Sequence, residues 1–322
     1  MKEAEVIFFE RQFPSANMVL IKDQRPLLID TGFGSDANET EQLIRLAGLP
    51  PEDLHLIVNT HYHSDHAGGN HHLQNNYGVK IAAHKWEAHL VNSRDFEACT
   101  AHWLDQPVEP YHVDLPLSEH DEIDTGTRKL KVLHTPAHTL GHICLYEPEE
   151  EILICGDFFH GNDLGWLNIF REGVAAILRA LEGLEQLALL PIRKAYSGHG
   201  PQIDRPHTAI DAARNRYEKW LKEPEKIAWH GCKRIFAYAL MIKDGLPKGE
   251  VRNYLLSCGW FQDFARYSFQ LEPEEFIQPL LDEMIRSGAA RWQDDRLVAV
   301  TPFQAPPQEW IEKNIQPKDW RL

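Results

Sequence analysis

The chain has few cysteines and no long apolar run. Five cysteines stand among 322 residues and none pairs in a C-x-x-C motif; they are Cys99, Cys144, Cys155, Cys232 and Cys258. An odd, scattered set indicates small buried residues in a reducing compartment. No stretch is long enough to span a bilayer, and no signal peptide can be recognised at the N-terminus. We therefore predict a cytoplasmic protein without a membrane partner.

Positive charge is also scarce. The chain has 33 lysines and arginines against 48 aspartates and glutamates, which gives a formal net charge of −15. An acidic protein repels phosphate backbones unless its basic groups gather on one face. This balance argues against nucleic acid as a partner and leaves small-molecule substrates open.

The overall composition is that of an ordinary globular protein, with 43% hydrophobic and 25% charged residues. The first two-thirds alternate between short β-like runs and helical patterns. After Pro224 the pattern becomes three helices and a hairpin around Asp294-Asp295, which resembles a small winged helix. We predict a catalytic domain at 1–205, a linker helix at 206–222, a winged-helix-like domain at 223–302 and a C-terminal tail at 303–322.

One segment concentrates potential metal ligands. Residues 60–66 read Thr-His-Tyr-His-Ser-Asp-His and directly follow a predicted strand at 54–58. In an extended segment, alternation places His61 and His63 on one side. The chain then bends and presents Asp65 and His66. Imidazole nitrogens suit zinc, and a carboxylate adds neutralising charge, so one run can supply two metals.

Three further candidate ligands follow other predicted strands. His138 lies in Thr-Pro-Ala-His-Thr after the strand at 128–133, and Asp157 lies in Cys-Gly-Asp after the strand at 152–155. His199 lies in Ser-Gly-His-Gly-Pro after the strand at 194–197. Glycine or proline beside each one marks a tight turn. Because turns at strand ends can meet at one edge of a sheet, we expect these side chains to converge.

The motifs H-x-H-x-D-H, T-P-x-H-T, G-D and G-H-G-P, in this order over residues 5–205, resemble the zinc hydrolase branch of the metallo-β-lactamase superfamily, which includes glyoxalase II-like and lactamase-beta-2-like enzymes. Two positions depart from the family pattern: Ala137 replaces a glycine and Ser197 replaces a proline. The resemblance implies an α+β fold, a four-layer αββα sandwich, with the winged-helix-like domain appended.

The resemblance also implies roles for individual residues. His61, His63 and His138 would bind one metal, Asp65, His66 and His199 would bind the second, and Asp157 would bridge the two. Asp30, in Leu-Ile-Asp-Thr-Gly, would orient a ligand histidine. Two divalent ions are therefore expected, zinc first, with iron or manganese as alternatives.

Two such ions about 3.5–4 Å apart activate a bridging hydroxide, which predicts a hydrolase of an ester, thioester or lactone. Asp65 lies beside the nucleophile in this scheme and would orient it or carry its proton. Residues soon after Asp157 are expected to line the substrate pocket; they are Phe158, His160, Asn168 and Arg171.

Two alternatives stay open at this point. The winged-helix-like domain would suit an endoribonuclease or phosphodiesterase, although basic residues do not outnumber acidic ones in 223–301. Such a domain can also serve as a lid or as a homodimer contact. The second alternative is an iron-dependent oxidoreductase, against which the complete set of seven ligands argues.

Overall fold

The computed structural model describes residues 4–321, with the side chains of residues 171 and 172 outside the description. The first sheet has six strands: β1 (Glu5–Phe9), β2 (Met18–Lys22), β3 (Leu27–Ile29), β4 (Leu56–Val58), β5 (Lys80–His84) and β6 (Leu115–Leu117). They lie in chain order, antiparallel from β1 to β3 and parallel from β3 to β6.

The second sheet has five strands, in the order β11-β10-β9-β8-β7. Their bounds are β7 (Glu122–Asp124), β8 (Lys129–His134), β9 (Ile143–Glu147), β10 (Ile152–Gly156) and β11 (Lys194–Ser197). Only β10 and β11 run parallel, and the other neighbours are antiparallel.

Alternating side chains explain why the two sheets stack. In β2, Val19 and Ile21 pack between the sheets, whereas Met18 and Leu20 face the helices on the other side. Strands β9 and β10 show the same period of two, with Ile143 and Ile152 between the sheets. A strand buried on both faces reads as a continuous apolar run, which is what these segments show.

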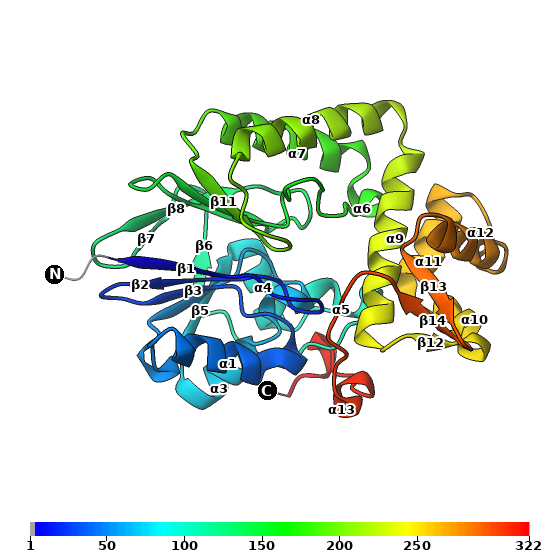
Figure 1. Ribbon diagram of the computed structural model, residues 1–322, viewed down its shortest axis with the longest axis horizontal. Helices are drawn as coiled ribbons and strands as arrows, with labels where there is room; N and C mark the ends of the chain where they lie inside the picture. The colour runs from blue at the N-terminus through cyan, green and yellow to red at the C-terminus, as the bar shows by residue number, and fades with distance from the viewer. Residues whose placement is uncertain (1–3, 322) are drawn as a thin grey trace.

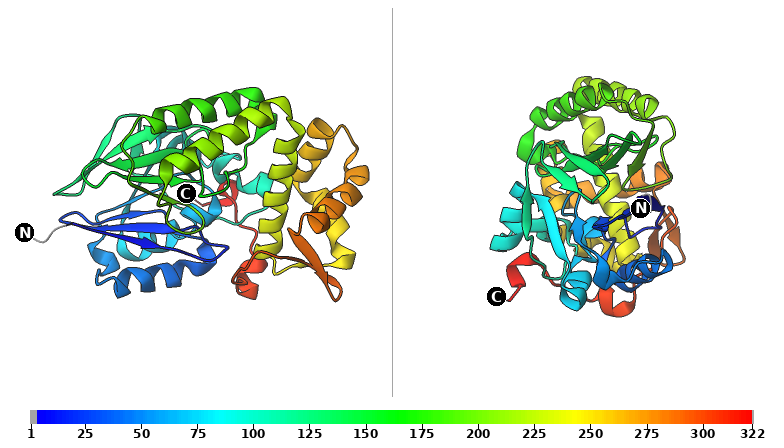
Figure 2. Two further views of the ribbon diagram at one scale, coloured as in Figure 1. Left: turned by 45° about the horizontal axis from the view of Figure 1, so that its top comes forward. Right: turned by 90° about the vertical axis from the view of Figure 1, so that its left-hand side faces the viewer.

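Helices cover both outer faces, which completes four layers (Figure 1). The first sheet is covered by α1 (Ala37–Leu46), α3 (Asn70–Tyr77) and α4 (Lys85–Ser93), and the second by α7 (Val174–Ala188) and α8 (Pro206–Lys222). The left view of Figure 2 shows α7 and α8 in green on one side of the sheets and the blue helix α1 on the opposite side. The α+β sandwich expected from the motifs is therefore confirmed.

A mostly helical module follows α8 at one end of the sandwich (Figure 1). Its elements are α9 (Glu225–Ile242), β12 (Leu246–Pro247), α10 (Lys248–Ser257), α11 (Gly259–Asp263), α12 (Pro273–Arg286), β13 (Ala290–Gln293) and β14 (Arg296–Ala299). The three short strands form one sheet in the order β12-β14-β13. Helix α9 lies between the sandwich and the other helices of this module, so one face of α9 is turned toward the end of the sandwich.

The tail, which contains α13 (Gln308–Ile311), returns to the sandwich. Trp310 packs on Phe33, and the Trp320 indole N–H donates to the Val108 carbonyl at 3.0 Å. None of the helices within residues 4–321 combines the length and apolarity needed to cross a bilayer.

Candidate metal centre

The His-rich segment lies at a sharp bend after β4. Residues 59–63 follow β4 without regular secondary structure, and the short helix α2 (Ser64–Ala67) begins directly after His63. Asp65 and His66 therefore lie in a first helical turn, while His61 and His63 precede it. Gly68, directly after α2, allows the backbone to pack closely on residue 34, because a Cβ there would lie 2.3 Å from the Gly34 nitrogen.

Three imidazole nitrogens meet in a first group. His61 Nε2 lies 3.1 Å from His63 Nδ1, which lies 2.9 Å from His138 Nε2. Ligands held about 2.0–2.1 Å from a tetrahedral zinc ion are about 3.3 Å apart, so the spacing is close to that of a zinc site. Burial and the neighbouring imidazoles hold the pKa of His61 and of His63 well below the usual histidine value, which leaves both rings neutral. Neutral imidazole is the form that binds metal.

A second group joins Asp65, His66 and His199. His199 Nε2 lies 3.2 Å from Asp65 Oδ2, and His66 Nε2 lies 3.8 Å from the same oxygen. Burial alone would lower the pKa of His66, but Asp65, Asp30 and Asp157 together raise it well above its usual value. The same charges would favour a bound cation, so this group is built to hold positive charge.

Asp157 lies between the two groups. Its Oδ1 is 3.3 Å from His66 Nε2, and its Oδ2 is 3.7 Å from His199 Nε2 and 3.8 Å from His138 Nε2. Both Asp157 Oδ1 and His66 Nε2 are buried and have no hydrogen-bond partner among the described residues. Two buried unpaired polar atoms at this distance need a proton or a cation between them. The donor set therefore fits divalent metal.

Polar contacts behind the ligands fix their orientation. His66 Nδ1 lies 2.8 Å from Asp30 Oδ2, and Asp30 also accepts hydrogen bonds from the Thr60 N–H and hydroxyl at 2.8 and 2.7 Å. Asp30 has a φ of 58°, a strained value for a residue with a side chain. His138 Nδ1 donates to the Trp166 carbonyl at 2.6 Å. In both His66 and His138 the contact holds Nδ1, so Nε2 is turned toward the cluster of ligands.

A cavity of about 460 Å³ opens beside this cluster. His63, Asp65, His138, Asp157 and His199 line it on the sandwich side. Helix α9 lines the opposite side with residues three or four positions apart, which form one helical face; they are His230, Lys233, Arg234, Ala237, Tyr238 and Met241. The site thus lies between the sandwich and the appended module.

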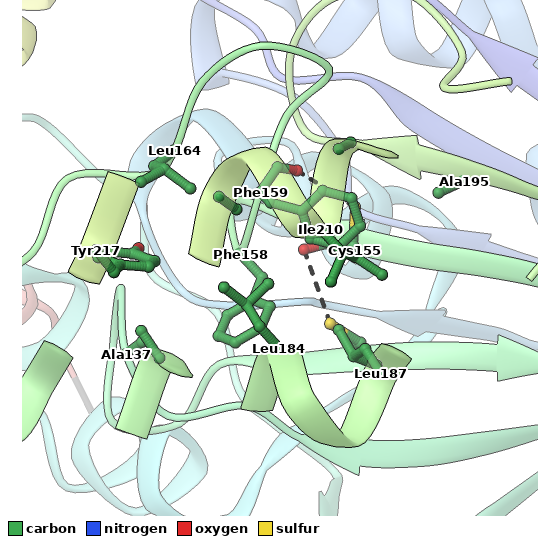
Figure 3. Close-up of a cluster of buried hydrophobic side chains, with 14 of the residues drawn as sticks. Ala137, Cys155, Phe158, Phe159, Leu164, Leu184, Leu187, Ala195, Ile210 and Tyr217 are labelled. Carbon is green, nitrogen blue, oxygen red and sulfur yellow. Dashed lines mark hydrogen bonds between the residues drawn. The ribbon is translucent and has the colours of Figure 1, made fainter. Parts of the chain in front are cut away.

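Only one of the predicted pocket residues, His160, is among the described residues that line the cavity. His160 lines the cavity, and burial lowers its pKa to about 3, so its ring is neutral. Phe158 does not line it, which corrects the prediction, because its ring points into the core against α7 (Figure 3). Asn168 directly precedes α6 (Ile169–Glu172) without a side-chain capping hydrogen bond, and it is also absent from the cavity lining. The Arg171 side chain lies outside the described part of the chain.

Several contributing residues were not predicted. His142 accepts the Asp157 N–H on Nε2 at 3.2 Å and donates from Nδ1 to the Thr135 hydroxyl at 2.9 Å. Trp166 stacks on His63 with ring centroids 5.4 Å apart, and Phe13 stacks on His199 at 4.6 Å. His142 carried a signal, since it lies four residues after His138 beside a glycine. Phe13 and Trp166 come from distant loops and carried none.

Glu87 is a further residue near the metal ligands that the sequence did not predict. Its carboxyl is buried behind the ligand loop, where Oε1 accepts a hydrogen bond from Thr139 at 2.5 Å. Burial raises its pKa to about 8. Below about pH 4.5 both folded and unfolded chains hold this proton; as the pH rises toward 8, only the unfolded chain releases it freely, so this group makes the fold progressively less stable.

We therefore expect Glu87→Gln, which cannot ionise, to gain stability relative to the unaltered protein as the pH rises. The gain between pH 5 and pH 8 should be on the order of a few kcal/mol, because each pKa unit corresponds to about 1.4 kcal/mol. Urea unfolding of both metal-loaded proteins at the two pH values measures it. The exposed Glu250→Gln serves as control, and a difference for Glu87→Gln that does not change with pH would refute the assignment.

A four-layer sandwich with histidines and aspartates converging at one end defines a metal-dependent hydrolase. The chain belongs to the metallo-beta-lactamase superfamily, whose family model matches residues 11–216.

Individual relatives share about one third of their residues with this chain over the aligned part. An acyl-coenzyme A thioesterase, MBLAC2 of Gallus gallus, is 34% identical over an alignment of 178 positions that covers 47% of this chain and 61% of the relative. A hydroxyacylglutathione hydrolase of Maricaulis maris is 33% identical over 195 residues, 59% of this chain and 65% of the relative. The chain thus spans less than two thirds of the length of each.

Solved structures share the fold. A metallo-beta-lactamase family protein of Thermus thermophilus has a TM-score of 0.56 at 23% identity, over 92% of this chain and 98% of its own. A metallo-beta-lactamase of Cronobacter sakazakii has a TM-score of 0.58 at 18% identity, over 69% of this chain and 95% of its own. The first match extends beyond the sandwich into the C-terminal module.

Proposed function

We propose that the chain is a dinuclear metal-dependent hydrolase of carboxylic thioesters, with esters and lactones as chemically related substrates. One observation carries the proposal: two groups of metal-binding side chains lie on either side of Asp157 and open on one cavity. In this proposal His61, His63 and His138 would hold one cation, Asp65, His66 and His199 would hold the second, and Asp157 would be available to both. Zinc suits these donors best, and its identity stays a prediction.

When bound, two divalent cations lower the pKa of water and polarise a carbonyl oxygen. Asp65 lines the cavity beside Asp157 and is held ionised, because His66 and His199 overcome the effect of burial and lower its pKa. It can accept the proton of the attacking water and return it to the departing group. The neutral His160 offers a hydrogen bond to the substrate without adding charge.

The choice of thioesters rests on the two relatives named above, whose names describe thioester hydrolysis. A thioester needs only attack of water at its carbonyl carbon and departure of a thiol, so no side-chain nucleophile is required. The apolar part of the cavity, which includes Leu104, Ala237 and Met241, can cover an acyl group.

The nucleic-acid alternative receives no support from the surface of the C-terminal module. On α12, Glu275 and Asp282 are exposed, Glu274 is paired with Arg252, and Arg286 is paired with Glu283. Exposed carboxylates on this helix would repel a phosphate backbone. We therefore do not extend the proposal to RNA. The cytoplasmic location and a homodimeric state stay predictions.

The direct test is a hydrolysis screen with protein reconstituted in zinc, iron or manganese. Release of free thiol from S-acyl coenzyme A and S-acyl glutathione is compared with turnover of p-nitrophenyl acetate, a γ-lactone, bis-p-nitrophenyl phosphate and RNA. We expect thioesters to give the largest kcat/KM. Phosphodiester or RNA cleavage without thioester hydrolysis would overturn the proposal.

A further inference from the structure

The cavity wall formed by α9 changes in character along the helix. Lys233 and Arg234 line one end, which we call the cationic end, and Ala237 and Met241 line the other with Leu104 and Ala289, which we call the apolar end. Tyr238 lies between these ends in helical order and contacts Phe13, the ring that stacks on His199. Arg234 and Met241 are about 10 Å apart along the helix axis. The metal centre thus adjoins the middle of a two-ended cavity.

The cationic end has more positive charge than its own ion pairs neutralise. Asp163 is shared by Arg234 and by Arg216, whose guanidinium lies 2.7 Å away. Glu283 is likewise shared by Lys233, at 3.0 Å, and by Arg286. Each of these carboxylates thus serves two cations at once. Lys233 and Arg234 line the cavity together with Asp163, whereas Arg216 and Arg286 do not. In a chain with a net charge of −15, two adjacent cations on one cavity wall are a local concentration of positive charge.

The same end has unused capacity for hydrogen bonds. The Arg234 side chain is 48% exposed although it is paired, so part of its guanidinium faces open space. His160 Nδ1 and His230 Nδ1 are both buried without a hydrogen-bond partner among the described residues, and both rings line this cavity. Buried unpaired ring nitrogens are costly unless a ligand satisfies them. This end therefore has the charge and the polar atoms of an anion site.

We propose that Lys233 and Arg234 bind an anionic group on the thiol half of the substrate, so that the substrate class is an anionic thioester with an apolar acyl chain. This inference rests on the proposed function. The acyl chain lies at the apolar end, the thioester carbonyl at the metal centre and the charged thiol carrier at the cationic end. Phosphate and carboxylate are both recognised by a guanidinium fork, so the carrier is a phosphorylated or a carboxylated thiol.

Binding of thioethers, which cannot be hydrolysed, tests the inference without using activity. S-hexyl coenzyme A is compared with S-hexyl pantetheine, which lacks the phosphates, and S-hexyl glutathione is compared with its diethyl ester. We expect metal-loaded protein to bind the anionic member of at least one pair tenfold or more tightly by calorimetry, and this preference to shrink as salt rises. The pair that shows the preference identifies phosphate or carboxylate as the recognised group.

Variants assign the preference to residues. Arg234→Gln and Lys233→Gln should each weaken the anionic thioether several-fold and change the neutral one less than twofold, and Arg234→Lys should lose part of the affinity. Arg252→Gln removes a charge from an exposed pair with Glu274 outside the cavity and should change nothing. If Arg234→Gln does not fold, Lys233→Gln and the salt dependence of the unaltered protein decide.

Equal affinity for the charged and neutral members of both pairs would overturn the inference, as would equal losses for both members in the variants. A failure of the proposed function looks different. In that case the anionic thioether still binds through Arg234, but no thioester is hydrolysed. If thioesters are hydrolysed without any charge preference, the function stands and only the anion site is wrong.

Discussion

Replacing Asp157 with alanine is expected to lower thioester turnover by at least about three orders of magnitude, equivalent to about 4 kcal/mol of transition-state stabilisation. This single carboxylate faces His66, His138 and His199 within 3.8 Å. Without it the two proposed cation sites lose their common ligand, and the charge balance of both changes. Turnover and metal content per chain, measured on the same preparation, report the effect.

Asp157→Asn separates charge from shape. The amide keeps the size of the side chain, so the metal-free protein should keep its fold as judged by circular dichroism, whereas the turnover loss should persist. The exposed Asp204→Ala is the matched control for loss of a carboxylate and should leave turnover unchanged. Near-normal activity of Asp157→Ala with two bound metals would show that this residue does not bridge them.

Much of the sandwich could be predicted because its strands carry strong local patterns. The expected strands at 128–133, 152–155 and 194–197 are observed at Lys129–His134, Ile152–Gly156 and Lys194–Ser197. The expected strand at 54–58 is observed at Leu56–Val58 and thus starts later than predicted. Boundaries shift by a few residues because capping and tertiary contacts decide them.

Other strands gave no clear signal. Strands β6 (Leu115–Leu117) and β7 (Glu122–Asp124) have only three residues each, and several of these residues are exposed at the sheet edges. Their pairing with Ala82–His84 and with Lys129–Lys131 exists only in the assembled sheets. A pattern so short has no detectable period, so the sequence alone could not locate these edges.

The sequence likewise indicated one part of the candidate site, the metal ligands, and not the other part, the cavity wall. Four of the seven proposed ligands stand in one short run at 61–66, and the other three lie in turns marked by glycine or proline, so sequence could indicate them before any distance was known. The pocket wall could not be indicated, because it depends on where α9 lies relative to the sandwich. Lys233 and Arg234 are ordinary helix residues in sequence and face the cavity only through packing of the module. Phe158 shows the reverse error, since nearness to Asp157 in sequence did not bring it into the cavity.

Removal of metal is expected to lower the melting temperature by about 10 °C or more. A ligand that binds only the folded state, present at about a thousand times its Kd, stabilises that state by about 4 kcal/mol per site. Each kcal/mol corresponds to about 2–4 °C for a domain of this size. The cause here is electrostatic, because Asp30, Asp65 and Asp157 come together in a largely buried site. Thermal unfolding before and after treatment with a chelator, with elemental analysis of each sample, measures the shift.

The size of this shift should depend on pH in a defined direction. In the metal-free protein a proton on His66 replaces part of the missing charge, since nearby carboxylates raise the pKa of that ring well above 6.5. Its stabilising effect is fully present below the unfolded pKa and is lost as the pH rises through the folded pKa. Metal binding strengthens over the same range because protons no longer compete for the ligands. The difference in melting temperature between metal-loaded and metal-free protein should therefore widen from pH 6 to pH 9, and a difference that narrows over this range would contradict a metal centre built around His66.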